Sequence, residues 1–115
     1  MAFTDLNYLH TITEGDTASM RELILLFIEQ VPEFIANLNK HLTEEQYIEL
    51  GKEAHKAKSS VMIMGMDTLG HDLKTLQLDT ISGIRKETYA QHVSRFEKEC
   101  LAAVEELNIA LKKMK

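Results

Sequence analysis

Apolar residues recur along this chain every three or four positions, in long runs that few residues interrupt. This spacing places apolar side chains on one face of an α-helix. Pro32 lies inside the first long run, and the spacing keeps its phase on both sides, so we expect the proline to kink a helix there and not to end it. The run consists of Met20, Leu23, Ile24, Phe27, Val31, Phe34, Leu38 and Leu42.

Two shorter helices are predicted after this run. The segment Thr43-Glu44-Glu45-Gln46 has the form of a capping box, which predicts a helix that begins there and ends near Met64, closed by Gly65. Asp67 is then expected to cap the next helix, which would end near Thr80. The apolar positions of this helix are Leu69, Leu73 and Leu76.

A last long helix follows the break at Ser82-Gly83. Its apolar seam alternates steps of four and three residues and consists of Tyr89, Val93, Phe96, Cys100, Ala103, Leu107, Ala110 and Met114. At the other end of the chain, Thr4 can cap a short helix from about Asp5 to Thr11. Long amphipathic helices with short connections predict an all-α, antiparallel (up-and-down) four-helix bundle. We expect residues 1–115 to form a single domain, with the short first helix covering one end.

Composition narrows the class of protein. The 115 residues are 44% apolar and 27% charged, which suits one ordinary domain, and the net charge of −5 argues against nucleic-acid binding. No apolar run approaches the ~20 residues that cross a bilayer, and the first residues lack a basic segment before an apolar one. We therefore expect a cytoplasmic, monomeric protein without a membrane segment. The single cysteine, Cys100, lies in the apolar seam, which predicts a buried, inert thiol.

His55 stands out because of its place on the third helix. At about 100° per residue, it lies at the border between the core stripe and a solvated face that includes Glu53 and Ser60. Gly51 in the helix interior costs about 1 kcal/mol relative to alanine, and close approach by another group is one reason to tolerate it. The neighbours of His55 are expected to form a small, partly apolar, accessible patch. They are Ile48, Gly51, Lys52, Lys58, Ser59 and Met62.

The next helix is predicted to add a polar group beside the imidazole. If the chain reverses near Gly65 and Met66, the residue that faces His55 in an antiparallel hairpin is Gln77. Its amide could hydrogen-bond the ring.

The remaining histidines offer no comparable site. His10, His41, His71 and His92 are scattered and are expected on solvated faces. Asp67 and His71 have a spacing that can hold a metal, but no third ligand is in view. No histidine has glutamate three residues before it, which excludes a di-iron bundle, and the chain has no glycine-rich loop for ATP.

These residues carry a resemblance to a known family. The pattern His55-x-x-Lys58, with small residues at Ser59 and Ser60 and with Gly65 ten residues after the histidine, resembles the histidine-containing phosphotransfer (HPt) domain of bacterial two-component phosphorelays. The similarity includes Gln77 and covers roughly the first two thirds of the chain, whereas the last helix matches only in kind. The family commonly has glycine where Ser59 stands.

The resemblance implies a relay function and its partners. An exposed histidine would take a phosphoryl group from the aspartyl phosphate of a response-regulator receiver domain and pass it to another. The expected partners are receiver domains and a hybrid sensor histidine kinase. No cofactor would be bound by this chain, and Mg²⁺ would belong to the partner receiver.

The chemistry of the residues agrees with such a transfer. An unperturbed imidazole has a pKa of ~6.5, so His55 presents an unprotonated nitrogen near neutral pH without a general base. Lys58 could stabilise charge on the phosphoryl oxygens, and Ser59 or Gln77 could hydrogen-bond the ring or the phosphoryl group. A receiver would dock on the surrounding surface, formed by Ile48, Gly51, Lys52, Met62 and Gly65.

Two other classes of protein remain as alternatives. A helical adaptor bundle that binds a receiver or a partner helix without phosphate chemistry would need the same amphipathic faces but no accessible histidine. A histidine kinase would require a separate ATP-binding domain, for which this chain has no space. If the relay function is correct, the protein is a phosphocarrier and not an autokinase.

Overall fold

The computed structural model describes residues 2–114, and within this range all regular secondary structure is helical. The elements are α1 (Asn7–Ile12), α2 (Thr17–Thr43), α3 (Tyr47–Ile63), α4 (Asp67–Ser82), the 3₁₀ turn η1 (Lys86–Thr88) and α5 (Tyr89–Lys113). The predicted all-α class, with four long helices and a short first one, is confirmed. None of the helices in residues 2–114 combines the length and the apolar character that a membrane span requires.

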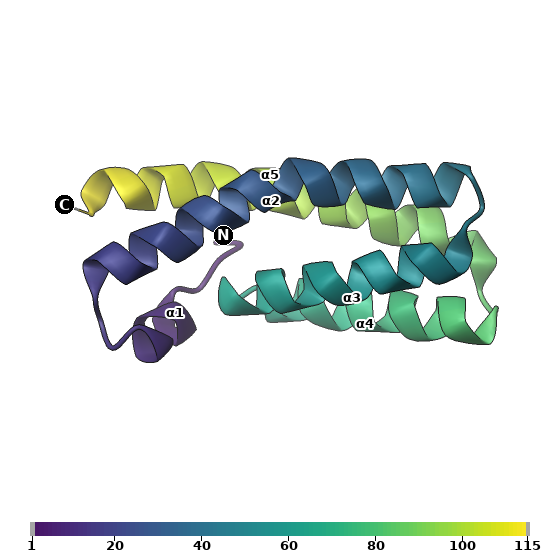
Figure 1. Cartoon of the computed structure of the whole chain (residues 1–115), viewed down its shortest axis with the longest axis horizontal. Coiled ribbons are helices and arrows are strands. Elements are labelled where there is room, and N and C mark those ends of the chain that lie inside the picture. Colours follow the sequence, from purple (N-terminus) through teal and green to yellow (C-terminus); the bar gives the residue numbers. More distant parts are fainter. Residues whose placement is uncertain (1, 115) are drawn as a thin grey trace.

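The four long helices form an elongated antiparallel bundle of 46 × 24 × 21 Å. Figure 1 shows α2 beside α5 along one side of the bundle, and the hairpin of α3 and α4 along the other. The apolar faces meet along the bundle axis, where Ile24, Leu50, Leu73 and Phe96 are fully buried. The 3-to-4-residue spacing read from the sequence therefore identifies the core.

The short helix α1 covers the end of the bundle where α3 turns into α4, as predicted. Its Leu9 is fully buried in the common core. The segment before it is fixed to the turn because the Asp5 amide donates to the Met64 carbonyl over 3.0 Å. The Thr4 amide and hydroxyl both donate to Glu106 of α5 over 3.0 Å. The first residues thus tie α1 to the α3–α4 turn and to α5.

The proline in α2 does not end the helix, which continues for eleven residues after Pro32 to Thr43. Figure 1 shows that α2 changes direction near its middle, where Pro32 lies. The phase of the apolar spacing across the proline was therefore a valid sign of one continuous helix. Phe34 and Leu38, beyond the proline, are both buried.

The predicted helix caps are wrong at three positions. Thr4 hydrogen-bonds Glu106 instead of capping α1, which begins at Asn7. Thr43 is the last residue of α2, because Glu45 adopts a left-handed φ of 55° and α3 begins only at Tyr47. Asp67 is already inside α4, whose N-cap residue is Met66 without a side-chain hydrogen bond. A polar residue near a helix start is therefore no proof that its side chain caps the helix.

Two polar residues predicted to be solvated are largely buried instead. Glu53 is only 7% exposed, and Asn37 of α2 donates a hydrogen bond of 3.1 Å to its carboxylate. His92 of α5 is half-buried, and its Nδ1 lies 2.9 Å from the carboxylate of Asp72 on α4. Both side chains have a partner on a neighbouring helix, which offsets the cost of burying them.

Candidate functional site

His55 and Gln77 meet across the α3–α4 hairpin as the antiparallel register predicts. The Nδ1 atom of the exposed His55 lies 3.2 Å from Oε1 of the half-buried Gln77. With the Gln77 amide oriented so that its oxygen faces the ring, this oxygen accepts and the ring proton lies on Nδ1. The other ring nitrogen, Nε2, is then unprotonated in the neutral ring and has its lone pair available.

The imidazole borders an open hollow of about 430 Å³ between α3 and α4. Two exposed isoleucines belong to its rim, Ile48 at 56% exposure on α3 and Ile81 at 64% on α4. The complete lining is Ile48, Gly51, Lys52, His55, Lys56, Gln77 and Ile81. Residues Lys56 and Ile81 were not predicted for this surface. The register that pairs His55 with Gln77 also places Ile81 near Gly51, so the signal for Ile81 was present in the sequence.

The prediction of an open surface at Gly51 is wrong. Gly51 is buried, and a Cβ atom added to it would overlap the Thr80 hydroxyl and would lie 3.3 Å from the Thr80 Cβ. The group that approaches this glycine closely is therefore α4 of the same chain. Any role of Gly51 in partner binding can involve only its backbone at the floor of the hollow.

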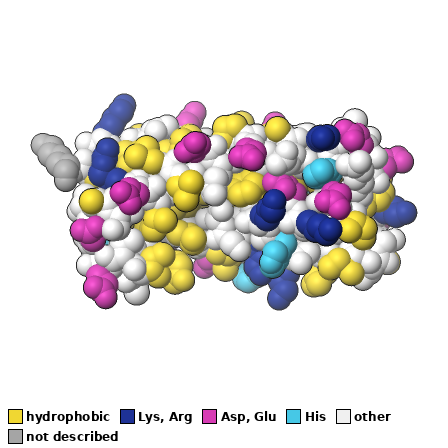
Figure 2. All heavy atoms as spheres, in the orientation of Figure 1, with side chains coloured by type: hydrophobic (Ala, Val, Ile, Leu, Met, Phe, Trp, Pro, Cys, Tyr) yellow, Lys and Arg dark blue, Asp and Glu magenta, His cyan; other side chains and the backbone are white. Residues whose placement is uncertain are grey.

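Helix α3 has a small net positive charge although the whole chain is acidic. Helix α3 carries Lys52, Lys56 and Lys58. Lys52 lies 3.4 Å from Glu49 and Lys56 lies 3.8 Å from Glu53, while Lys58 forms no ion pair with any residue in the range 2–114. Figure 2 shows Lys or Arg side chains around a histidine in the right half of the face drawn. An incoming anionic group would therefore meet an unpaired ammonium one turn from His55.

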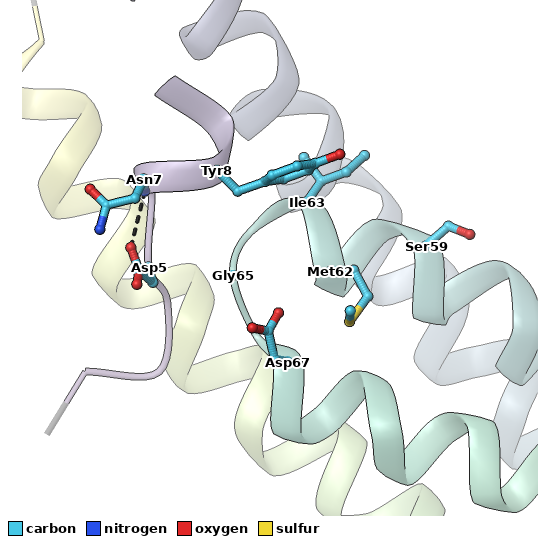
Figure 3. Close-up of a pocket in the computed structure, with 8 residues that line it drawn as sticks. All are labelled: Asp5, Asn7, Tyr8, Ser59, Met62, Ile63, Gly65 and Asp67. Atoms are coloured by element: carbon cyan, nitrogen blue, oxygen red, sulfur yellow. Dashed lines mark hydrogen bonds between the residues drawn. The ribbon is translucent and has the colours of Figure 1, made fainter. Parts of the chain in front are cut away.

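The other predicted contact residues line a different hollow. Ser59, Met62 and Gly65 border a depression of about 650 Å³ that also includes Asp5 and Tyr8. Figure 3 shows Asp5 on one side of the turn at Gly65, with Met62 and Asp67 on the other, and Tyr8 of α1 over the end of α3. The predicted docking surface is thus divided between the His55 hollow and this second depression. The His55 ring contacts Gln77, and Ser59, one turn after His55 on α3, lines the second depression.

The remaining candidate groups behave as inert parts of the bundle. Burial raises the pKa of the Cys100 thiol to about 12, so the thiolate that would be reactive is not formed near neutral pH. This agrees with the predicted buried, inert cysteine. Within residues 2–114, no three His, Cys, Asp or Glu side chains are grouped so that they could hold a metal ion.

The fold and site together define a class of protein. An antiparallel four-helix bundle that presents an exposed histidine, held by an amide and flanked by an unpaired lysine, has the features of a histidine phosphotransfer domain. The chain belongs to the Hpt domain family, whose model matches residues 22–113. Membership of this family implies histidine phosphotransfer in a phosphorelay.

The extent of this match differs from the resemblance read from the sequence. It includes α5, which was expected to match only in kind, and it leaves α1 outside. Comparisons with the curated proteins and with the solved structures found no match.

Proposed function

We propose that this chain relays phosphoryl groups between the aspartates of response-regulator receiver domains through Nε2 of His55. The single observation that carries this proposal is the contact of 3.2 Å between His55 Nδ1 and Gln77 Oε1. This contact supports a proton on Nδ1 and an unprotonated Nε2 on the other side of the ring, away from Gln77. His41 makes a similar contact of 3.1 Å with Gln46, but it is half-buried, whereas His55 is exposed and has an unpaired lysine one turn away.

The transfer step balances without a base in this chain. The lone pair of Nε2 forms the N–P bond while the P–O bond to the receiver aspartate breaks, and the carboxylate leaves with that electron pair. The ring keeps its Nδ1 proton and becomes a phosphorylated imidazolium. Gln77 Oε1 remains the acceptor for that proton, so the positive charge on the ring is stabilised. The reverse sequence delivers the phosphoryl group to a second receiver.

Lys58 has the place of an electrostatic stabiliser. It follows His55 by one helical turn, and it is half-buried. An ammonium without an ion-pair partner has its full charge available for phosphoryl oxygens. We expect the acidic pocket and its Mg²⁺ to be supplied by the receiver. A receiver would dock its aspartate over the His55 hollow, with Ile48 and Ile81 as apolar contacts at the rim.

The decisive experiment is acceptance of phosphate from a labelled phospho-receiver. We expect label on the wild-type protein and none on His55→Gln. His41 has a similar glutamine contact but Glu44 three residues after it, and His71 has Lys74 at that spacing but no glutamine contact within residues 2–114. His71→Gln is the matched control, since His71 is an exposed histidine on α4, and it should accept label at the wild-type rate. The label should be lost in acid and retained in base, as expected for a phosphoramidate, and ATP with Mg²⁺ alone should label nothing.

The same assay separates the alternatives. A helical adaptor would bind the receiver and take no label. Label that persists in His55→Gln would reject His55 as the acceptor, and label from ATP alone would indicate a kinase.

A further inference from the structure

We propose that the contact between Gly51 and Thr80 is a positioning device that sets the distance between α3 and α4, and through it the hydrogen bond that fixes the His55 ring. Gly51 and Thr80 would thus be positioning residues, which act on His55 through Gln77. The proposal goes beyond the relay function, because it concerns the ring of the free protein. Only its kinetic consequence rests on that function.

The geometry places this contact one turn from the site on both helices. Gly51 precedes His55 by four residues on α3, and Thr80 follows Gln77 by three on α4. A Cβ atom on Gly51 would overlap the Thr80 hydroxyl and would lie 3.5 Å from the Gln77 carbonyl oxygen. The helices therefore approach as closely as the absence of a side chain allows, directly beside the residue that holds the imidazole.

Thr80 is held rigidly on its side of this contact. It is only 3% exposed, and its hydroxyl donates to the Gln77 carbonyl over 2.7 Å. A β-branched side chain has few rotamers, and this one would lose a buried hydrogen bond if it turned away. An added methyl group at residue 51 is therefore expected to move the helices apart, since Thr80 cannot yield.

A small separation at this point is enough to affect the ring. The bond between His55 Nδ1 and Gln77 Oε1 is already 3.2 Å long, near the upper limit for a sound hydrogen bond. A few tenths of an ångström more would weaken the bond, and the ring would then exchange between its two tautomers. The fraction with an unprotonated Nε2 would fall.

A second glycine on the hairpin provides the comparison. A Cβ atom on Gly70 of α4 would meet the sulfur of Met62, which is the far end of a flexible side chain. Gly70 lies seven residues before Gln77, as Met62 lies seven after His55. An alanine here fills similar space at a similar helix interface, but its neighbour can move aside. Gly70→Ala is thus a matched control for added volume.

The test measures the His55 ring directly by ¹⁵N NMR of the free protein, across a pH titration. The wild type should show the Nδ1–H tautomer once the ring is neutral. Gln77→Ala, which removes the hydrogen bond without steric conflict, defines the signature of an unheld ring. Gly51→Ala should move toward that signature and should slow acceptance from a phospho-receiver by about threefold to tenfold, the range for loss of one neutral hydrogen bond. Gly70→Ala should keep the wild-type tautomer.

Rescue distinguishes positioning from general damage. Thr80→Ala removes the atom in conflict, so Gly51→Ala combined with Thr80→Ala should restore the Nδ1–H tautomer and the rate. A folded Gly51→Ala with an unchanged His55 tautomer would overturn the proposal, and so would a double variant that stays at the Gln77→Ala signature.

If Gly51→Ala does not fold, Thr80→Val tests the positioning role instead. It presses a methyl group against Gly51, and it should shift the tautomer in the same direction. An unchanged tautomer in that variant would refute the positioning role. None of the tautomer results requires that the protein accept phosphate, so a failed relay function would appear separately, as absent label with the ring behaviour intact.

Discussion

Replacement of Gly65 by alanine should cost this fold much more than a turn glycine normally does. Gly65 has a left-handed φ of 75°, which costs an L residue about 1–2 kcal/mol. In addition, a Cβ atom there would overlap the Asp5 carbonyl oxygen and would lie 2.8 Å from the carbonyl carbon. These atoms belong to the backbone of the segment that leads into α1, so no side-chain rotation can relieve the conflict.

The expected loss of stability follows from the contacts that Asp5 and α1 would have to give up. Moving Asp5 away breaks the hydrogen bond of 3.0 Å that its N–H donates to the Met64 carbonyl, which contributes about 1 kcal/mol. Displacement of α1 would also loosen Leu9, which is fully buried, and full exposure of a leucine costs about 1.5–3 kcal/mol. With partial relaxation, we expect Gly65→Ala to lower the free energy of unfolding by about 2–4 kcal/mol.

Gly83 supplies the control for the backbone effect alone. Its φ is 68°, and a Cβ atom added to it would have no heavy atom within 4 Å. Gly83→Ala should therefore cost only about 1–2 kcal/mol. Urea denaturation followed by circular dichroism measures both values, and hydrogen exchange should show reduced protection in α1 for Gly65→Ala only. Equal losses of stability in the two variants would refute the argument that the N-terminal segment is tied to this turn.

Two further predictions concern charged groups. Lys58→Ala should slow phosphoryl acceptance and leave thermal unfolding unchanged. Lys98 is an exposed lysine on α5, and Lys98→Ala should change neither the rate nor thermal unfolding. Equal transfer rates for the two variants would contradict a role of Lys58 in the transfer. The buried Asp79 carboxylate accepts two hydrogen bonds from Arg85, which lower its pKa below the ordinary 3.8, so the stability from this pair is present above that pH and lost as the pH falls through the lowered value. Asp79→Asn should lower the free energy of unfolding by about 1–3 kcal/mol at pH 7, and a deficit that does not shrink in acid would contradict this account.

The bundle could be predicted because its signals are local and repeated. In each long helix, apolar residues mark the buried face in several successive turns. The apolar spacing also keeps its phase across Pro32, which correctly indicated one continuous helix although proline usually breaks helices. The contact of His55 with Gln77 could also be predicted, because the position of the turn between two antiparallel helices fixes their register.

The features that the sequence did not reveal depend on side chains that come from a neighbouring helix. The carboxylate of Glu53 reads as solvated until Asn37 of another helix is placed beside it, and His92 likewise depends on Asp72. The capping box at Thr43 satisfies every local rule for a helix start, yet α2 continues through it. Gly51 showed that something approaches closely, but a sequence does not distinguish a neighbouring helix from a partner protein.

The arrangement of the site within one hairpin has a consequence for folding and local opening. His55, Lys58, Gln77 and the Gly51–Thr80 contact all lie between Tyr47 and Ser82, in two consecutive helices. Contacts of such short sequence separation form with a small loss of chain entropy, and segments of this kind often open and close as one cooperative unit. Fraying of α1, or of the N-terminal end of α2 and the C-terminal end of α5, can therefore proceed without disturbing the imidazole.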